Sequence, residues 1–224
     1  SRAVIDSRQA ADMDLFIALP GERVDGHDYV QAAFERGAVA ALVCKDMPEG
    51  LNILDLRKSY FDPQRIDIAP PVCLRVDDTL SALQTLAADW RKKHPIRTIG
   101  ITGSVGKTTT KELTASLLSQ KYTVLKNPGN RNNEIGLPLT ILELEPIHEC
   151  AVLEMGFYVP GEIRTLCEIA QPHIGVVTNI GTVHAERAGS QEIIAKGKAE
   201  LVESLPPRPE GVAILNMDDP WVRW

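Results

Sequence analysis

The stretch Gly100-Ile-Thr-Gly-Ser-Val-Gly-Lys-Thr-Thr-Thr110 decides the fold of this chain. It follows an apolar run of strand character and opens a segment with helical spacing. A glycine-rich turn between a strand and a helix leaves backbone N–H groups unpaired, and these groups, with the positive end of the helix dipole, favour a bound phosphate. Lys107 is placed to reach the terminal phosphates of a nucleoside triphosphate, and the Thr108 hydroxyl to bind magnesium. The stretch therefore predicts a nucleotide-binding loop.

The spacing of this loop differs from the commonest P-loop, in which four residues separate a glycine from Gly-Lys-Ser/Thr. Here two residues, Ser104 and Val105, separate Gly103 from Gly106-Lys107-Thr108. A strand-turn-helix junction that needs glycines only for its turn is the alternative. The lysine and the hydroxyl stand where a phosphate and a metal ion need them, so the spacing still favours nucleotide binding.

The composition of the chain excludes several classes of protein. The chain has 224 residues, 44% of them hydrophobic, and a net charge of -6, which fits one or two domains with a proper core. The negative charge and the absence of a basic block argue against nucleic acid as a partner. No apolar run is long enough to span a bilayer, so we expect no membrane insertion. A motif close to the first residue and a strand-like run close to the last indicate a fragment of a longer protein.

The cysteines are scattered and have no metal-ligand spacing. Three of the four stand in or beside apolar runs, which favours buried free thiols in a reducing cytoplasm; disulfides are the alternative. They are Cys44, Cys73, Cys150 and Cys167.

The pattern predicts a small N-terminal α/β domain over residues 1–78. We expect strands at 14–19, 38–44 and 72–76 and a helix at 29–36, with residues 45–71, rich in proline, as a loop with little periodic structure. Asp78 caps an amphipathic helix that ends at Pro95. The domain boundary is placed at the start of this helix.

The pattern of residues 79–224 predicts the first part of a P-loop-type ATPase domain with a parallel sheet, and this domain is incomplete. Strands are expected at 96–102, 150–154, 174–180 and 212–216, and helices at 107–120, 161–170 and 190–205. Strands that alternate with helices indicate a parallel sheet covered on both faces. Ligands of such sheets bind beyond the carboxyl ends of the strands, where the phosphate loop also lies.

Two candidate metal ligands follow other strands of this sheet. Glu154 ends the run Ala151-Val-Leu-Glu154, where a second magnesium ligand belongs; an exposed acid at a strand end is the alternative. His184 follows strand 174–180 at the same edge, as a metal or substrate contact or as a structural histidine.

Lys198 lies in an apolar stripe of helix 190–205, with Ile194, Leu201 and Leu205. A lysine that extends to solvent along its stem is one interpretation. The other is an amine that burial keeps neutral. A neutral amine can react with carbon dioxide and become a carbamate, an anionic oxygen ligand for magnesium.

The segment Asn127-Pro-Gly-Asn-Arg-Asn-Asn-Glu-Ile-Gly-Leu-Pro138 is dense in small polar residues. It is either a plain loop that leads into a helix or a source of amide and carboxylate contacts near the phosphates. The residues alone leave both open.

Together these motifs resemble the Mur ligase family, ATP-dependent enzymes that form amide bonds in peptidoglycan synthesis. Asp6-Ser-Arg8, the run Asp14-Leu-Phe-Ile-Ala-Leu-Pro-Gly-Glu22 and Asp25-Gly-His27 are similar to the family's UDP-sugar-binding domain, although Met13 replaces the usual glycine. The phosphate loop, residues 130–138 and Glu154-Met-Gly are similar to the branch that adds D-alanyl-D-alanine to UDP-N-acetylmuramoyl-tripeptide.

The resemblance implies ATP and Mg²⁺ as cofactors, these two compounds as substrates, a cytoplasmic location and a monomer. It implies catalytic roles for Lys107, His184 and Lys198, with Lys198 at the position of a carbamylated lysine. The implied metal ligands are Thr108, Glu154, His184 and Lys198. The implied nucleotide contacts are Gly103, Ser104, Val105, Gly106, Lys107, Thr108, Thr109, Asn133 and Glu134, and the implied UDP-substrate contacts are Ser7, Arg8, Asp25, Gly26 and His27.

Two alternatives stay open at this point. One is another amino acid ligase of the same family, and the other is a nucleotide-binding relative without ligase activity. We expect the 224 residues alone to form no amide bond.

Overall fold

The structure is a computed structural model that describes residues 2–21, 23–57, 69–181 and 190–223. The chain divides into two compact units, Ser1–Thr85 and Leu86–Trp224. The division falls inside helix α2 (Thr79–Lys92), whereas sequence patterning places the boundary where this helix begins. Among the described residues, no helix has the length and apolar character needed to cross a membrane.

The first unit is built on a five-stranded parallel sheet in the order β1-β2-β3-β5-β4. Its core forms where α1 packs against β2, β3 and β5 through small and aromatic side chains, among them Phe16, Ala33 and Ala41. The elements are β1 (Ala3–Val4), η1 (Ser7–Gln9), β2 (Leu15–Ile17), η2 (Gly26–Tyr29), α1 (Val30–Glu35), β3 (Ala40–Val43), β4 (Asn52–Asp55) and β5 (Val72–Arg75).

The prediction of a loop over residues 45–71 is wrong at β4. Asn52–Asp55 pairs with Val72–Arg75 at the edge of the sheet. An edge strand has one neighbour, and the residues of β4 are exposed or half-buried. Such a strand carries little of the apolar patterning by which a strand is recognised in sequence. Residues 58–68 lie outside the described part of the chain.

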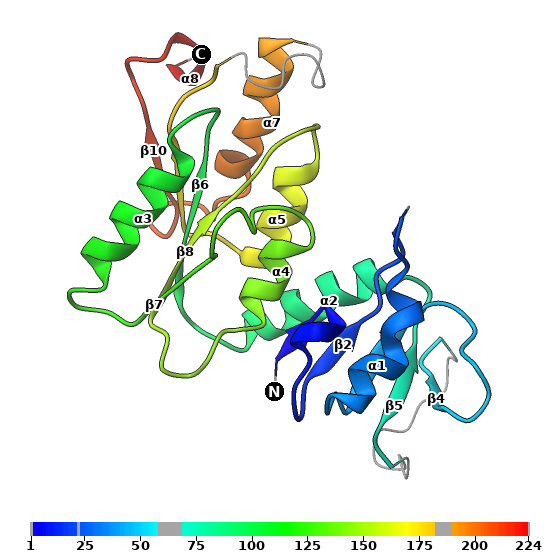
Figure 1. The fold of residues 1–224 in the computed structure, drawn as a ribbon. Helices are drawn as coiled ribbons and strands as arrows, with labels where there is room; N and C mark the ends of the chain where they lie inside the picture. Colours follow the sequence, from blue (N-terminus) through cyan, green and yellow to red (C-terminus); the bar gives the residue numbers. More distant parts are fainter. Residues whose placement is uncertain (1, 22, 58–68, 182–189, 224) are drawn as a thin grey trace. The chain divides into compact units, whose positions relative to one another are not determined.

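The second unit has a parallel sheet in the order β10-β9-β6-β8-β7, which confirms the expected α/β class. Apolar residues of α3 cover one face, and those of α4, α5 and α7 cover the other (Figure 1). The strands are β6 (Arg97–Thr102), β7 (Val124–Lys126), β8 (Cys150–Glu154), β9 (Ile174–Val177) and β10 (Val212–Leu215). The helices are α3 (Lys107–Leu118), α4 (Gly136–Ile141), α5 (Glu162–Ala170), α7 (Gln191–Glu203) and α8 (Pro220–Arg223).

Each expected element of this unit is present, with ends that differ by a few residues. The sequence patterns do not predict β7, a strand of three residues. Helix α4 begins inside the polar segment 127–138, so this segment leads into a helix, and its contacts with phosphates stay a prediction. All four cysteines are free, and Cys73, Cys150 and Cys167 are buried.

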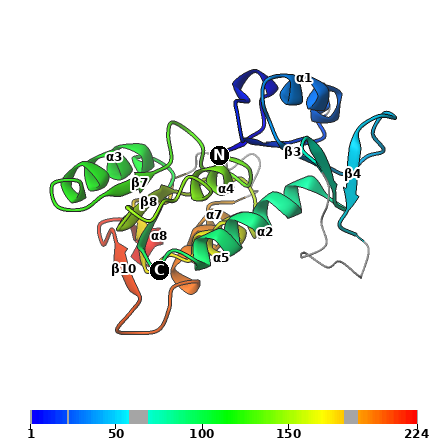
Figure 2. The same ribbon diagram turned by 90° about the horizontal axis from the view of Figure 1, so that it is seen from below.

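Helix α2 supplies an anchoring side chain to each unit. Thr79 donates a hydrogen bond from its hydroxyl to the Ala18 carbonyl (3.0 Å) in the first unit. Arg91 is buried in the second unit and donates to the carbonyls of Ala170 (2.8 Å), His94 (2.7 Å) and Ile96 (3.1 Å). Figure 2 shows the C-terminal half of α2 beside α5, whose last carbonyls this guanidinium satisfies.

Candidate functional site

The phosphate loop connects β6 to α3 and needs glycine at two positions. Gly103 has a φ of +149° and Gly106 a φ of +84°, both in the region that favours glycine. A Cβ atom on Gly103 would lie 1.9 Å from Thr178 Oγ1. Lys107 Nζ donates to the Gly103 carbonyl (2.9 Å), and burial lowers the pKa of this amine. The side chain of Lys107 therefore folds back onto the main chain of the loop.

Side chains at the end of β9 hold this loop in place. Asn179 accepts a hydrogen bond at Oδ1 from the Val105 N–H (2.9 Å) and donates from Nδ2 to the Val105 carbonyl (2.8 Å). Thr178 Oγ1 donates to the same carbonyl (2.8 Å), and the Gly181 N–H donates to Ser104 Oγ (2.9 Å). These bonds tie the main chain of the loop to the segment that follows β9.

Glu154, at the end of β8, points at the phosphate loop. Only 2% of the surface of this residue is exposed, and Oε2 accepts a hydrogen bond from Thr108 Oγ1 at 2.7 Å. Oε1 accepts from Asn132 Nδ2, also at 2.7 Å. The exposed acid considered above is therefore excluded, and the structure brings together the two predicted ligands, Thr108 and Glu154.

These oxygens fit a magnesium ion, because Mg²⁺ prefers hard oxygen ligands and is bound by one or two carboxylates beside substrate phosphates. Within the described ranges, no group of three or more histidine, cysteine or acidic side chains could hold a metal ion. His184, the other predicted histidine ligand, lies outside the described residues.

The polar segment after β7 supplies part of the site. Asn133 accepts a hydrogen bond from the Gly136 N–H (2.8 Å) and thereby caps α4. Glu134, beside it, is half-buried, and Thr109, on the first turn of α3, is exposed. Their contact with a nucleotide stays a prediction.

Lys198 on α7 is buried, with only 3% of the residue exposed. Its Nζ lies 5.0 Å from the centroid of the Phe157 ring. Burial, and to a smaller extent the charge of Lys107, lower the pKa of the amine from its ordinary 10.5 to about 7. A Lys198 side chain that extends to solvent is therefore excluded. A neutral amine is available near neutral pH.

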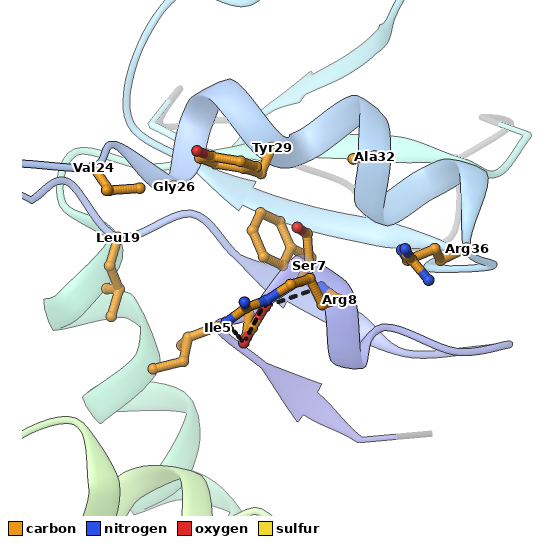
Figure 3. A pocket seen from close by; sticks show the side chains of 11 residues that line it. Ile5, Ser7, Arg8, Leu19, Val24, Gly26, Tyr29, Ala32 and Arg36 are labelled. Atoms are coloured by element: carbon orange, nitrogen blue, oxygen red, sulfur yellow. Dashed lines mark hydrogen bonds and ion pairs between the residues drawn. The ribbon is translucent and has the colours of Figure 1, made fainter.

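In the first unit, Ser7, Arg8 and Gly26 line a pocket of about 620 Å³ (Figure 3). Arg8 makes a double hydrogen bond to Asp6 (Nε to Oδ1, 2.9 Å; terminal nitrogen to Oδ2, 2.8 Å). This contact lowers the pKa of Asp6 to about 2. The aromatic rings of Phe16 and Tyr29 form other parts of the wall, so the pocket offers both a cation and apolar faces.

Asp25 and His27 line a different pocket of this unit, of about 690 Å³. His27 is buried, and its Nδ1 lies 2.6 Å from Asp25 Oδ1 while its Nε2 accepts from the Cys44 N–H (3.0 Å). Asp25 also pairs with Lys45, which holds the pKa of the carboxyl well below its usual range. Both ring nitrogens thus have protein partners, so His27 joins η2 to the end of β3.

Sequence reasoning missed several side chains that organise the site, among them Lys111, Asn127, Asn132 and Asn179. Lys111 follows Lys107 by four residues, so a shared helix face was the available signal. Asn179 follows a predicted strand at the same edge as Glu154, which was the corresponding signal for this amide.

Comparison with known families gives two matches. A family model described as the Mur ligase middle domain matches residues 101–224. A second, described as the Mur ligase family catalytic domain, matches residues 3–91.

Among curated proteins, the UDP-N-acetylmuramoyl-tripeptide–D-alanyl-D-alanine ligase of Synechocystis is 45% identical over 96% of this chain and 43% of its own length. The ligase of the same name from Bacillus subtilis is 42% identical over the same shares. Among solved structures, MurF from Acinetobacter baumannii has a TM-score of 0.83 and 36% identity, covering 99% of this chain and 44% of that one. MurF ligase from Thermotoga maritima in complex with ADP has a TM-score of 0.82 and 34% identity, covering 99% and 47%. The chain spans less than half the length of these relatives.

Proposed function

The chain belongs to the Mur ligase family, and from that premise we propose that it forms part of an ATP-dependent ligase that adds D-alanyl-D-alanine to UDP-N-acetylmuramoyl-tripeptide. The observation that carries this proposal is the 2.7 Å hydrogen bond between Thr108 and Glu154 beside the phosphate loop. It joins a hydroxyl and a carboxylate at the place where a nucleotide-bound metal ion needs oxygen ligands. The names of the similar ligases supply the substrates.

The phosphate loop is the proposed ATP site. Its N–H groups and the N-terminus of α3 face the position of the phosphates. Lys107 exchanges its contact with the Gly103 carbonyl for the terminal phosphates when nucleotide binds. The structure of the Thermotoga relative, which is in complex with ADP, supports nucleotide binding by this chain.

Thr108, Glu154, His184 and Lys198 are the proposed residues for magnesium. Magnesium bound there would neutralise charge on the phosphates. The buried carboxylate of Glu154 is already aimed at the loop, so little reorganisation accompanies binding.

The proposed reaction has two steps. The terminal phosphoryl group of ATP passes to the free carboxylate of the tripeptide, which gives an acyl phosphate and ADP. The amine of D-alanyl-D-alanine then attacks the acyl carbon, an amide bond forms, and phosphate leaves while the amine loses a proton. A carboxylate alone is a poor acyl donor, because its leaving group would be oxide. Lys107 contributes by position and charge.

Lys198 is proposed to act as a carbamate. Its neutral amine adds to carbon dioxide and loses one proton, so that a buried neutral amine becomes an anionic oxygen ligand. Bicarbonate is expected to raise the melting temperature of the chain and to leave Lys198→Met unchanged. An equal rise in both proteins would exclude the carbamate.

The pocket in the first unit is the proposed site of the UDP-sugar part of the substrate. Arg8, which Asp6 holds through two of its nitrogens, offers its remaining N–H groups for a phosphate. Ser7 offers a hydroxyl, and Phe16 and Tyr29 offer apolar walls for a base or sugar. Gly26 lies in the same wall. Asp25 and His27 are proposed to set the position of η2, since both are bonded within the protein. We further propose a monomer in the cytoplasm.

Nucleotide binding by this chain tests the site. Lys107→Met is expected to abolish the magnesium-dependent binding of ADP in calorimetry. Lys126→Met, an exposed lysine that pairs with Glu112, is the matched control and is expected to bind as the unchanged chain does. In the full-length protein, phosphate release that requires both the tripeptide nucleotide and D-alanyl-D-alanine is the expected result. Release without either substrate, or no release, would contradict the ligase.

A further inference from the structure

We propose that Asn127, anchored by the buried Lys111, is the positioning residue that fixes Glu154 for the metal ion. The inference deepens the proposed function and rests on it. It assigns roles to two fully buried polar side chains outside the predicted set of site residues.

The argument starts from the direction of the main chain at Glu154. The next residue, Met155, donates its N–H to the Ile101 carbonyl on β6 (2.8 Å). Because main-chain groups alternate along a strand, the N–H and C=O of Glu154 face β7 on the other side. The pairing of β7 with β8 ends at Lys126 and Val152, two residues before Glu154.

The side chain of Asn127 takes the place of the missing ladder. Its Oδ1 accepts from the Glu154 N–H (2.9 Å), and its Nδ2 donates to the Glu154 carbonyl (2.9 Å). Nδ2 also donates to the Arg131 carbonyl (2.8 Å). One amide therefore holds both main-chain groups of the residue that carries the carboxylate, and joins them to the segment that carries Asn132.

Lys111 explains why the main chain of β7 does not continue the ladder. Its Nζ donates to the Asn127 carbonyl (2.7 Å) and to the Gly129 carbonyl (3.3 Å), so these acceptors face α3. Glu112 Oε1, 3.2 Å from the same nitrogen, balances the charge. The ammonium thus ties the helix of the phosphate loop to the segment that holds Glu154.

The main chain of Glu154 is therefore fixed on the side that faces β7. Its two carboxylate oxygens accept hydrogen bonds from Thr108 and Asn132. Residues that orient metal ligands in this way affect metal affinity by about 10- to 100-fold when replaced. Asn179 makes the same two-bond contact with Val105 of the phosphate loop. Asn179 is therefore a matched control, because its side-chain amide holds the phosphate loop and not the residue that carries the carboxylate.

The test compares ADP dissociation constants of the full chain in excess Mg²⁺ and in EDTA, by calorimetry. Asn127→Leu removes the amide and keeps a side chain of similar size. It is expected to lower the ratio of the dissociation constant in EDTA to that in Mg²⁺ by about tenfold or more, with the constant in EDTA unchanged. Asn179→Leu is expected to weaken binding in both media by the same factor. Melting curves establish that each variant is folded, and Asn127→Ser replaces Asn127→Leu if the latter unfolds.

Two results would overturn the proposal. A folded Asn127 variant with the ratio of the unchanged chain would show that the amide does not act on the metal site. An equal loss in both media would show a role in the fold alone. If the unchanged chain itself binds ADP without any effect of Mg²⁺, the proposed function fails first, and this outcome is distinguishable from the other two.

Discussion

The burial of Lys198 predicts that part of the stability of this chain depends on pH. In the unfolded chain the amine has its ordinary pKa of 10.5, and in the folded chain burial lowers the pKa to about 7. Between these values the unfolded chain holds a proton that the folded chain lacks, so a rise in pH favours folding. The contribution is complete above pH 10.5 and is lost as the pH falls through 7.

The two pKa values set the size of the effect. Between pH 7 and pH 9 the free energy of unfolding gains about 2 kcal/mol from this group. Lys198→Met has no proton to exchange and keeps the stem of the side chain. The difference in unfolding free energy, variant minus unchanged chain, is therefore expected to fall by about 2 kcal/mol across this range.

Urea denaturation at pH 7, 8 and 9 measures this difference, in buffers freed of carbon dioxide so that the amine stays unmodified. Lys196→Met is the matched control, because Lys196 lies on the same helix with its side chain 61% exposed. Its difference from the unchanged chain is expected to be flat with pH. If Lys198→Met also gives a flat difference, the amine is not desolvated and the reasoning from burial fails.

Other variants test the loop, the anchor and the pocket. Gly103→Ala places a Cβ at 1.9 Å from Thr178 Oγ1 and is expected to weaken ADP binding more than about tenfold, measured by calorimetry. Arg91→Met removes the guanidinium donor from three carbonyls, of which that of His94 keeps the Ile96 N–H, and is expected to lower the free energy of unfolding by about 3 kcal/mol in urea; a change under about 1 kcal/mol would contradict the anchor. Arg8→Ala is expected to weaken UDP binding to the chain by about tenfold while leaving ADP binding unchanged; equal loss of both would refute separate sites.

The second unit could be predicted well from sequence because its signals are local. The glycines and the lysine of the phosphate loop stand next to each other in the chain, and parallel strands bring their carboxyl ends to one edge. The meeting of Thr108 with Glu154 follows from these two facts. The burial of Lys198 follows from the apolar stripe of its helix.

Other features depend on partners far along the chain. The edge strand at Asn52–Asp55 forms through pairing with β5, and its own residues carry little apolar patterning. The amide of Asn127 reaches Glu154, 27 residues away, only because β7 ends where it does. The imidazole of His27 meets the backbone of Cys44 across a turn and a helix. Contacts of this kind depend on how distant segments pack together, which a single sequence does not show.

Helix α2 has a practical consequence for dividing the molecule. Thr79 anchors it to Ala18, and Arg91 anchors it to Ala170, so each unit uses a different end of the same helix. A gene fragment that stops at residue 78 loses the first anchor, and one that starts after residue 92 loses the second. A cut between Thr85 and Leu86 keeps Thr79 with the first unit and Arg91 with the second, but it leaves each piece with only half of the helix. Pieces that each carry residues 79–92 keep the whole helix, but they could not rejoin as complementary halves without displacing one copy.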